Sequence, residues 1–250
     1  MLTTIAIVQA RMGSSRLPGK SLRPLIGRTV LGLLLERLKR ARKLDAIVIA
    51  TSDRAIDDPI VSVAGRYGLQ SVRGSEEDVL DRFQRAVFEM PAQVIVRICA
   101  DNPLTDPEQV DSLVEYFQKR GCDYAYSNRP ECGLPCGVGA EVISAKALRL
   151  VHEEARSAQH REHVTLYVLD HPAIFKIGVL MAPPALWYPE IRLDVDYQGD
   201  LTFLESICGL LRESPEADWT TSEIVELLLA RPELLELRRR AYLEAKSLPH

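Results

Sequence analysis

The chain has 250 residues, a net charge of −4, 46% hydrophobic residues and 26% charged residues. These values predict a single domain over residues 1–250 with a substantial core. They argue against broad nucleic-acid binding, which needs a surplus of basic residues. No apolar run approaches the ~20 residues of a membrane span, and the first residues lack the pattern of a secretory signal. The five cysteines are scattered, which predicts reduced thiols in the cytoplasm.

An apolar run at residues 5–10 predicts a buried strand, and a basic loop with two glycines follows it at residues 11–20. Successive loop N–H groups can form a concave anion site, and three cations add positive charge around it. This favours a polyphosphate site over the alternative, a solvated surface turn. Neither the Walker pattern nor the G-x-G-x-x-G fingerprint occurs. The expected nucleotide contacts are Ala10, Arg11, Gly13, Ser14, Ser15, Arg16 and Lys20, with Arg11 and Lys20 as the catalytic groups.

Hydrophobic periodicity predicts that strands and helices alternate along the first half of the chain. This alternation predicts a mainly parallel sheet. The pattern S-x-x-D from Ser75 to Asp78 predicts a capping box that opens a helix. The expected strands are 46–50, 70–73, 94–100 and 123–126, and the expected helices are 29–42, 56–67, the one opened at Ser75, and 107–120.

Polar residues stand where two of these strands end. Ligands of open α/β sheets bind outside the carboxyl ends of strands, so Asp53 is a nucleotide-site candidate, with a helix cap as the alternative. Asp101 suits Mg²⁺, a hard ion with oxygen ligands, or else a cap or turn. Arg97 interrupts an apolar strand, so it either pairs with an internal carboxylate or faces the nucleotide.

The second half of the chain carries a D-x-D at Asp194 and Asp196. In a strand these side chains share a face, where two carboxylates repel unless a cation lies between them. Together with Asp101 this favours a divalent metal site over the alternative, in which Asp196 caps the helix expected at 197–211. His160 and His163 lack a third ligand nearby, which favours a structural role over zinc. A strand is also expected at 138–143 and at 174–180, a helix at 144–155, and two helices within 221–246.

The run A-R-M-G-S-S-R-L-P-G-K at residues 10–20 resembles the N-terminal signature of sugar-activating cytidylyltransferases. The resemblance is greatest to the SpsF-like, spore-coat polysaccharide branch, to which the acylneuraminate and 3-deoxy-manno-octulosonate cytidylyltransferases are related. Later segments extend it over most of the chain: R-G-S-E-E-D-V-L-D-R-F, D-N-P-L, R-E-H-V-T and R-L-D-V-D. It implies a three-layer α/β nucleotidyltransferase fold, GT-A-like and Rossmann-like, with a mainly parallel mixed sheet. It also implies a hairpin or dimerisation lobe at about 128–143 and a helical appendage at about 220–246.

The resemblance also implies roles for individual residues. Three residues of this chain match family positions near the base and ribose. Three others match or neighbour metal ligands of the family, and five match positions on the sugar side of the cleft. Ala100 replaces a family glycine, Gly139 an acidic residue, and Asp194 a threonine of the SpsF pattern. The implied nucleotide residues are Arg73, Ser75 and Arg82, with Asp53 and Arg97 from the arguments above; the metal ligands are Asp101, Asp196 and Asp194; the substrate residues are Asn102, Glu141, Arg161, Glu162 and His163.

The expected activity is cytidylyl transfer. A hydroxyl of a sugar, expected to be a sugar acid of the nonulosonate type, attacks the α-phosphate of CTP with Mg²⁺ as cofactor, and pyrophosphate leaves. The expected partners are CTP and the sugar acid, with neither nucleic acid nor a membrane span, in a cytoplasmic homodimer. One alternative is a metal-dependent GT-A glycosyltransferase that uses the D-x-D with a nucleotide sugar. The other is a non-catalytic nucleotide-binding module.

Overall fold

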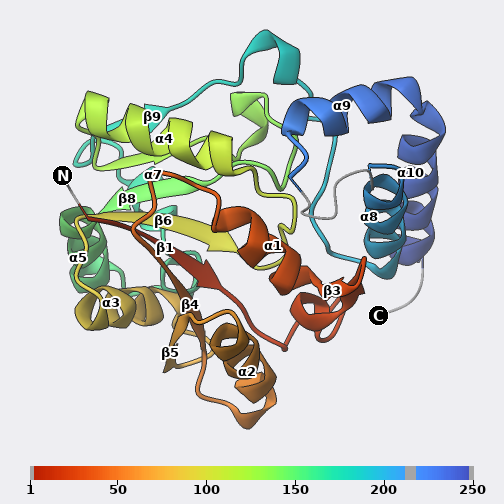
Figure 1. The fold of residues 1–250 in the computed structure, drawn as a ribbon. Helices are drawn as coiled ribbons and strands as arrows, with labels where there is room; N and C mark the ends of the chain where they lie inside the picture. The colour runs from red at the N-terminus through yellow and green to blue at the C-terminus, as the bar shows by residue number, and fades with distance from the viewer. Residues whose placement is uncertain (1–2, 212–217, 248–250) are drawn as a thin grey trace.

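A computed structural model describes residues 3–211 and 218–247. A seven-stranded sheet forms the middle layer, and helices cover both of its faces (Figure 1). Its strand order is β5-β4-β1-β6-β8-β7-β9, and a separate two-stranded hairpin joins β2 to β3. The strands are β1 Thr4–Gln9, β2 Pro24–Leu25, β3 Arg28–Thr29, β4 Ala46–Ser52, β5 Gln70–Gly74, β6 Val94–Cys99, β7 Tyr124–Tyr126, β8 Glu141–Ser144 and β9 Ile177–Val179.

The sheet is mixed. β1 pairs in parallel with β4 and β6, β4 with β5, and β7 with β9, whereas β8 runs antiparallel to both of its neighbours, β6 and β7. The expected mainly parallel mixed sheet is therefore confirmed. Because β1 and β6 are parallel neighbours, their carboxyl ends lie side by side, and the loops that follow them begin at the same place.

The helices pack in two layers, and each layer has its own apolar core. Leucines of α1 and aliphatic residues of α2 and α4 cover one face, while α3, α5 and α7 cover the other. A third core lies under the C-terminal helices α8 and α9. The α-helices are α1 Val30–Leu38, α2 Asp58–Arg66, α3 Val79–Glu89, α4 Pro107–Arg120, α5 Ala145–Glu154, α6 Ala158–Glu162, α7 Leu166–Asp170, α8 Gln198–Leu210, α9 Thr221–Ala230 and α10 Pro232–Ser247.

One expected helix cap is wrong, and the alternative role of Asp196 as a helix cap does not hold. Asp78, not Ser75, caps α3, and its side chain accepts the Asp81 N–H. At α8 the N-cap is Tyr197, and the acid that closes the capping box is Asp200 rather than Asp196. In both places a short motif contained more than one side chain able to cap, and tertiary contacts decided between them.

The irregular segment after β7 contains a single 3₁₀ turn, Pro130–Cys132, and a loop that leads into β8. Near the C-terminus, α9 and α10 are separated at Arg231, as the Arg-Pro pair predicts. The segment 191–196 belongs to no named strand, and an isolated bridge between Arg192 and Cys136 links it to the loop before β8. Across residues 3–211 and 218–247, no helix combines the length and the apolar character needed to cross a bilayer. All five cysteines are free thiols.

Candidate active site

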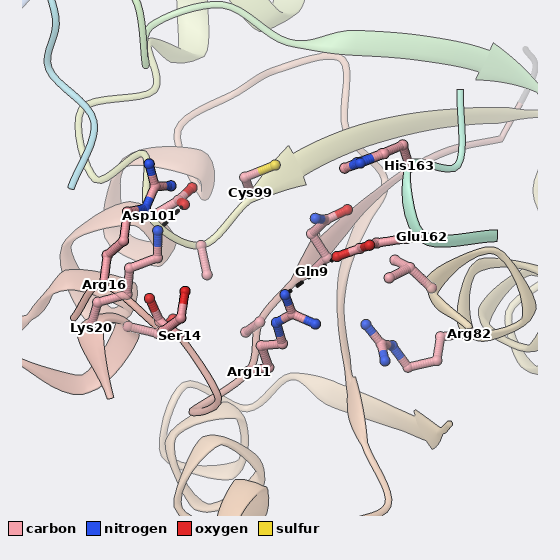
Figure 2. A pocket seen from close by; sticks show the side chains of 15 residues that line it. Gln9, Arg11, Ser14, Arg16, Lys20, Arg82, Cys99, Asp101, Glu162 and His163 are labelled. Carbon is pink, nitrogen blue, oxygen red and sulfur yellow. Dashed lines mark hydrogen bonds and ion pairs between the residues drawn. The ribbon is translucent and has the colours of Figure 1, made fainter. Parts of the chain in front are cut away.

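A pocket of about 260 Å³ lies at the carboxyl ends of β1 and β6. The loop after β1 forms one wall, and α3 and the end of α6 contribute the opposite side (Figure 2). Figure 2 shows two groups of side chains, with Ser14, Arg16, Lys20 and Asp101 at one end. The lining residues are Gln9, Ala10, Arg11, Ser14, Ser15, Arg16, Lys20, Ser21, Val79, Arg82, Cys99, Ala100, Asp101, Glu162 and His163.

Lys20 joins three distant parts of the chain. Its Nζ lies 2.5 Å from Asp101 Oδ2 and 3.1 Å from Asp196 Oδ1, and it also donates to the Val195 carbonyl at 3.0 Å. Burial lowers the pKa of this ammonium, but the two carboxylates outweigh that effect and raise the pKa above its ordinary value. Lys20 is therefore fully charged at neutral pH.

Asp196 comes from the C-terminal third of the chain, yet it meets the loop that follows β1. Arg16 donates to Asp196 Oδ1 at 2.7 Å, and the Val195 N–H donates to the Asp101 carbonyl at 2.9 Å. The backbone bond ties the segment 191–196 to the end of β6. The cationic loop and two of the three expected metal-binding carboxylates, Asp101 and Asp196, thus converge on one site.

Asp57 anchors the loop at residues 11–20, although no sequence motif indicated this residue. The carboxylate is 1% exposed and accepts the Met12 N–H at 2.7 Å and the Ser52 N–H at 3.3 Å, together with the Ser52 hydroxyl. Asp57 lies directly before α2, where its local pattern is that of a helix cap. Its role depends on a contact with a residue 45 positions away, which no local motif reveals.

Glycines let the loop fold closely. Gly19 has φ +70°, a left-handed conformation, and its N–H donates to the Met12 carbonyl at 2.9 Å. A Cβ on Gly13 would lie 2.4 Å from Glu76 Oε1, so a larger residue there would displace either the loop or Glu76. The predicted Gly13 contact is thus a position of close packing, and it does not line the pocket.

Arg97 has the internal carboxylate partner that its place in a strand requires. It pairs with Glu141 of β8 and donates to Gln9 Oε1 at 3.0 Å. Glu141 is 3% exposed and also accepts the hydroxyls of Tyr124 at 2.5 Å and Thr165 at 3.1 Å. Burial opposes ionisation of Glu141, but Arg97 and these hydrogen bonds hold its pKa below the ordinary value. This buried network lies beneath Gln9 and does not bring Glu141 into the pocket.

Arg82 is a buried cation in the pocket wall. Its guanidinium donates to the carbonyls of Ser75 at 2.5 Å and Glu76 at 3.0 Å, while its Nε meets no acceptor within the part of the chain that the structure describes. Burial and the nearby Arg11 both lower its pKa. Ser75 itself is exposed and contributes only its carbonyl to this contact.

Glu162 and His163 reach the pocket at the end of α6, and Arg11 lies 3.5 Å from Glu162 across it. Val164, which follows, has φ +35°, a strained conformation for a β-branched residue. Arg161 points elsewhere: it binds the Asp78 carboxylate at 2.5 Å and fixes α6 to the start of α3.

Three further predicted residues lie outside the pocket lining. Asp53 is exposed, and it caps neither of the helical turns that follow it. Arg73 donates to the carbonyls of Ser52 and Arg54, both at 2.9 Å, and pairs with Asp58 at 2.7 Å. Asn102 forms a turn through its backbone. Cys99, which no motif indicated, does line the pocket, and burial raises the pKa of its thiol to about 12, so it is neutral there.

Asp101 and Asp196 fit a divalent cation better than Asp194 does. Asp101 and Asp196 each direct a carboxylate oxygen toward Lys20 Nζ, so the two oxygens lie close enough to share a cation. Asp194 binds Arg192 through both carboxylate oxygens, and although its burial opposes ionisation, this arginine holds its pKa below the ordinary value. Within 3–211 and 218–247 no three acidic, histidine or cysteine side chains gather as a complete metal site. A cation bound by the two aspartates would thus need further oxygen ligands from phosphate or water.

Comparisons with known proteins identify the family and the fold. A family model described as "Cytidylyltransferase" matches residues 5–242. The chain is 37% identical over 232 residues to the spore coat polysaccharide biosynthesis protein SpsF of Bacillus subtilis, covering 91% of this chain and 94% of that protein. It is 28% identical over 214 residues to the 8-amino-3,8-dideoxy-manno-octulosonate cytidylyltransferase of Shewanella amazonensis, covering 82% and 84%. A solved cytidylyltransferase structure from Leptospira borgpetersenii superposes with a TM-score of 0.87 at 27% identity, over 94% of this chain and 97% of that one.

Proposed function

The chain belongs to the cytidylyltransferase family, a class of CTP-dependent nucleotidyltransferases, and from this premise we propose that its acceptor is a sugar acid. The proposed reaction is attack of a sugar hydroxyl on the α-phosphate of CTP, which gives a CMP-sugar and pyrophosphate for polysaccharide synthesis. The family matches confirm the resemblance to SpsF-like proteins. The choice of a sugar acid is supported by the octulosonate substrate in the name of the Shewanella relative.

The observation that carries the proposal is the position of Lys20. It ends the basic loop and lies between Asp101 and Asp196, which come from the end of β6 and from the segment before α8. Negative charge on a triphosphate requires cations near its oxygens, and hard carboxylate ligands suit the ion that accompanies it. The cations and the carboxylates come together at the carboxyl ends of β1 and β6.

We propose that Asp101 and Asp196 hold Mg²⁺, which when bound would neutralise phosphate charge and help to orient the reacting oxygens. Lys20, Arg16 and Arg11 bind the triphosphate from the other side and stabilise the charge that develops on the departing pyrophosphate. The hydroxyls of Ser14 and Ser15, which line the pocket, add hydrogen-bond donors. These groups are preorganised, because Asp57 and Gly19 fix the loop before any ligand arrives.

The end of the pocket away from Lys20 is proposed to receive the nucleoside and the sugar. Arg82, Glu162 and His163 lie there with Arg11, so this end offers both signs of charge (Figure 2). Glu162 and His163 can form hydrogen bonds with sugar hydroxyls. Gln9, which Arg97 holds in place, forms the floor between the two ends.

Two alternatives make different demands on the site. A metal-dependent glycosyltransferase would use both acids of the D-x-D, but Asp194 is bound by Arg192. A non-catalytic module would bind CTP without releasing pyrophosphate. The glycosyltransferase alternative does not explain why a cytidylyltransferase model matches residues 5–242, whereas the non-catalytic module differs from the proposal in turnover alone.

A panel assay tests the proposal. The protein is incubated with CTP, Mg²⁺ and a set of octulosonic and nonulosonic acids, and pyrophosphate release is measured. Pyrophosphate with at least one acid, and none with a nucleotide sugar as sole donor, is the expected result. CTP binding by calorimetry with no turnover across the panel would favour the non-catalytic module.

The proposal extends to location and assembly. The five free thiols fit a reducing compartment, so we place the enzyme in the cytoplasm. The resemblance to its family implies a homodimer, which light scattering on the purified protein tests. A mass of one chain would remove that part of the proposal and leave the chemistry unaffected.

A further inference from the structure

The C-terminal helix α10 lies beside α8 (Figure 1), and its residues 238–242 contact the start of α8, directly after the segment that carries Asp196. The two helices approach closely, because a Cβ added to Gly199 at the start of α8 would lie 2.4 Å from the Ala241 Cβ. Only glycine at position 199 permits this spacing. Helix α10 is therefore seated at a defined place beside the segment that carries Asp196.

Arg238 is the side chain through which α10 reaches the site's acids. It is 12% exposed, and its NH2 group lies 2.9 Å from Asp200 Oδ1 and 3.7 Å from Asp194 Oδ1. The guanidinium also lies over the Phe203 ring, 5.8 Å from its centroid. By contrast, the neighbouring Arg239 is 69% exposed and pairs with Glu236 of its own helix.

Asp200 transmits this contact to Asp196. While one oxygen of its carboxylate accepts from Arg238, the other accepts the N–H groups of Asp196 and Tyr197, both at 2.8 Å. The backbone at residue 196 is thereby fixed. The Asp196 side chain then meets Lys20 at 3.1 Å and Arg16 at 2.7 Å.

A second, independent contact links α10 to the same place. The ring of Tyr242 packs edge-on against Tyr197, with centroids 5.8 Å apart, and Tyr197 in turn lies 5.6 Å from the Arg16 guanidinium. Both routes start on α10 and end on a partner of Asp196. A helix with a purely packing role would need neither a buried arginine nor this orientation of rings.

We propose that Arg238 is a positioning residue: it orients Asp200 and, through Asp200, holds the Asp196 carboxylate against Lys20. The C-terminal helix is thus part of the active-site architecture. The kinetic part of this inference rests on the proposed cytidylyl transfer, whereas the structural part does not.

The first experiment compares Arg238→Ala, Arg238→Lys and the matched control Arg239→Ala. A small displacement of a preorganised group lowers turnover strongly, so Arg238→Ala is expected to reduce kcat by about 10- to 100-fold while KM for CTP changes much less. Arg238→Lys restores a donor to Asp200 and should recover most of kcat. Arg239→Ala should behave as the wild type. A folded Arg238→Ala variant with unchanged kcat would overturn the proposal.

The second experiment moves α10 without removing any charge. Gly199→Ala forces the two helices apart at a contact that cannot accept a methyl group, and Ala241→Gly in the same chain returns the space. The single variant Gly199→Ala should lose kcat, and the double variant should regain it. Loss of kcat with no recovery in the double variant would show that the close contact is not what matters, and would count against the inference.

Hydrogen exchange separates this inference from the proposed function. The Asp196 and Tyr197 amides should exchange faster in Arg238→Ala and in Gly199→Ala, while amides of β1 and β4 keep their protection. This result is expected even if no sugar acid is turned over. Unchanged exchange at residues 196–197 would overturn the positioning role whatever the assay of activity shows.

Discussion

Replacing Lys20 with alanine removes a cation that touches both Asp101 and Asp196. Its side chain is only 14% exposed and donates to Asp101, Asp196 and the Val195 carbonyl. Deleting one preorganised donor at a site of developing charge typically costs about 2.7–4 kcal/mol, or 10²–10³ in rate. We expect kcat/KM of Lys20→Ala to fall by that factor.

The assay is initial-rate pyrophosphate release from CTP and the best sugar acid of the panel. Lys119→Ala serves as the matched control, because Lys119 is 73% exposed and pairs with Glu115 on its own helix. The control should retain wild-type kinetics. If Lys20→Ala also retained wild-type kinetics, the proposed catalytic role of Lys20 and of the charges that converge on it would be wrong.

The same variant separates binding of metal from catalysis. The Lys20 ammonium lies between the carboxylates of Asp101 and Asp196. Its removal leaves two carboxylates without this cation, so we expect a lower Tm that Mg²⁺ raises more in Lys20→Ala than in the wild type. An equal Mg²⁺ effect on both proteins would place the ion elsewhere.

Two further variants test the supports of the pocket. Glu141→Gln leaves the Arg97 charge buried without its counter-ion, so urea denaturation should show a loss of about 3–5 kcal/mol. Because folding depresses the pKa of Glu141 below 4.5, its contribution is present above that pH and lost as the pH falls through the depressed value; the variant's stability should show a weaker acid dependence. Asp57→Asn weakens the anchor of the Met12 N–H, so KM for CTP should rise and that amide should exchange faster; an unchanged KM would mean that the loop needs no such anchor.

Local patterns predicted the first half of the fold closely. Asp106 and Pro107 open α4, and Gly121 with φ +57° closes it, so the expected helix at 107–120 coincides with the observed one. The buried strands were predicted equally well, because their short apolar runs are typical of strands buried on both faces. These signals lie within the element that they define.

The parts that escaped prediction depend on contacts between distant residues. The position of β8 between β6 and β7 reflects the pairing of Glu141 with Arg97, 44 residues away, which the loop before β8 does not reveal. Asp57 and Asp200 each read as ordinary helix-start acids, although both hold backbone of the active site. By contrast, the convergence of Lys20 with Asp101 and Asp196 was expected, because motifs marked all three.

The most direct test is a crystal structure with a non-hydrolysable CTP analogue and Mn²⁺, in which anomalous scattering locates the ion. The account predicts an anomalous peak at the carboxylates of Asp101 and Asp196, with the triphosphate along the loop at residues 11–20. A peak or a nucleotide bound away from these two aspartates and Lys20 would contradict it.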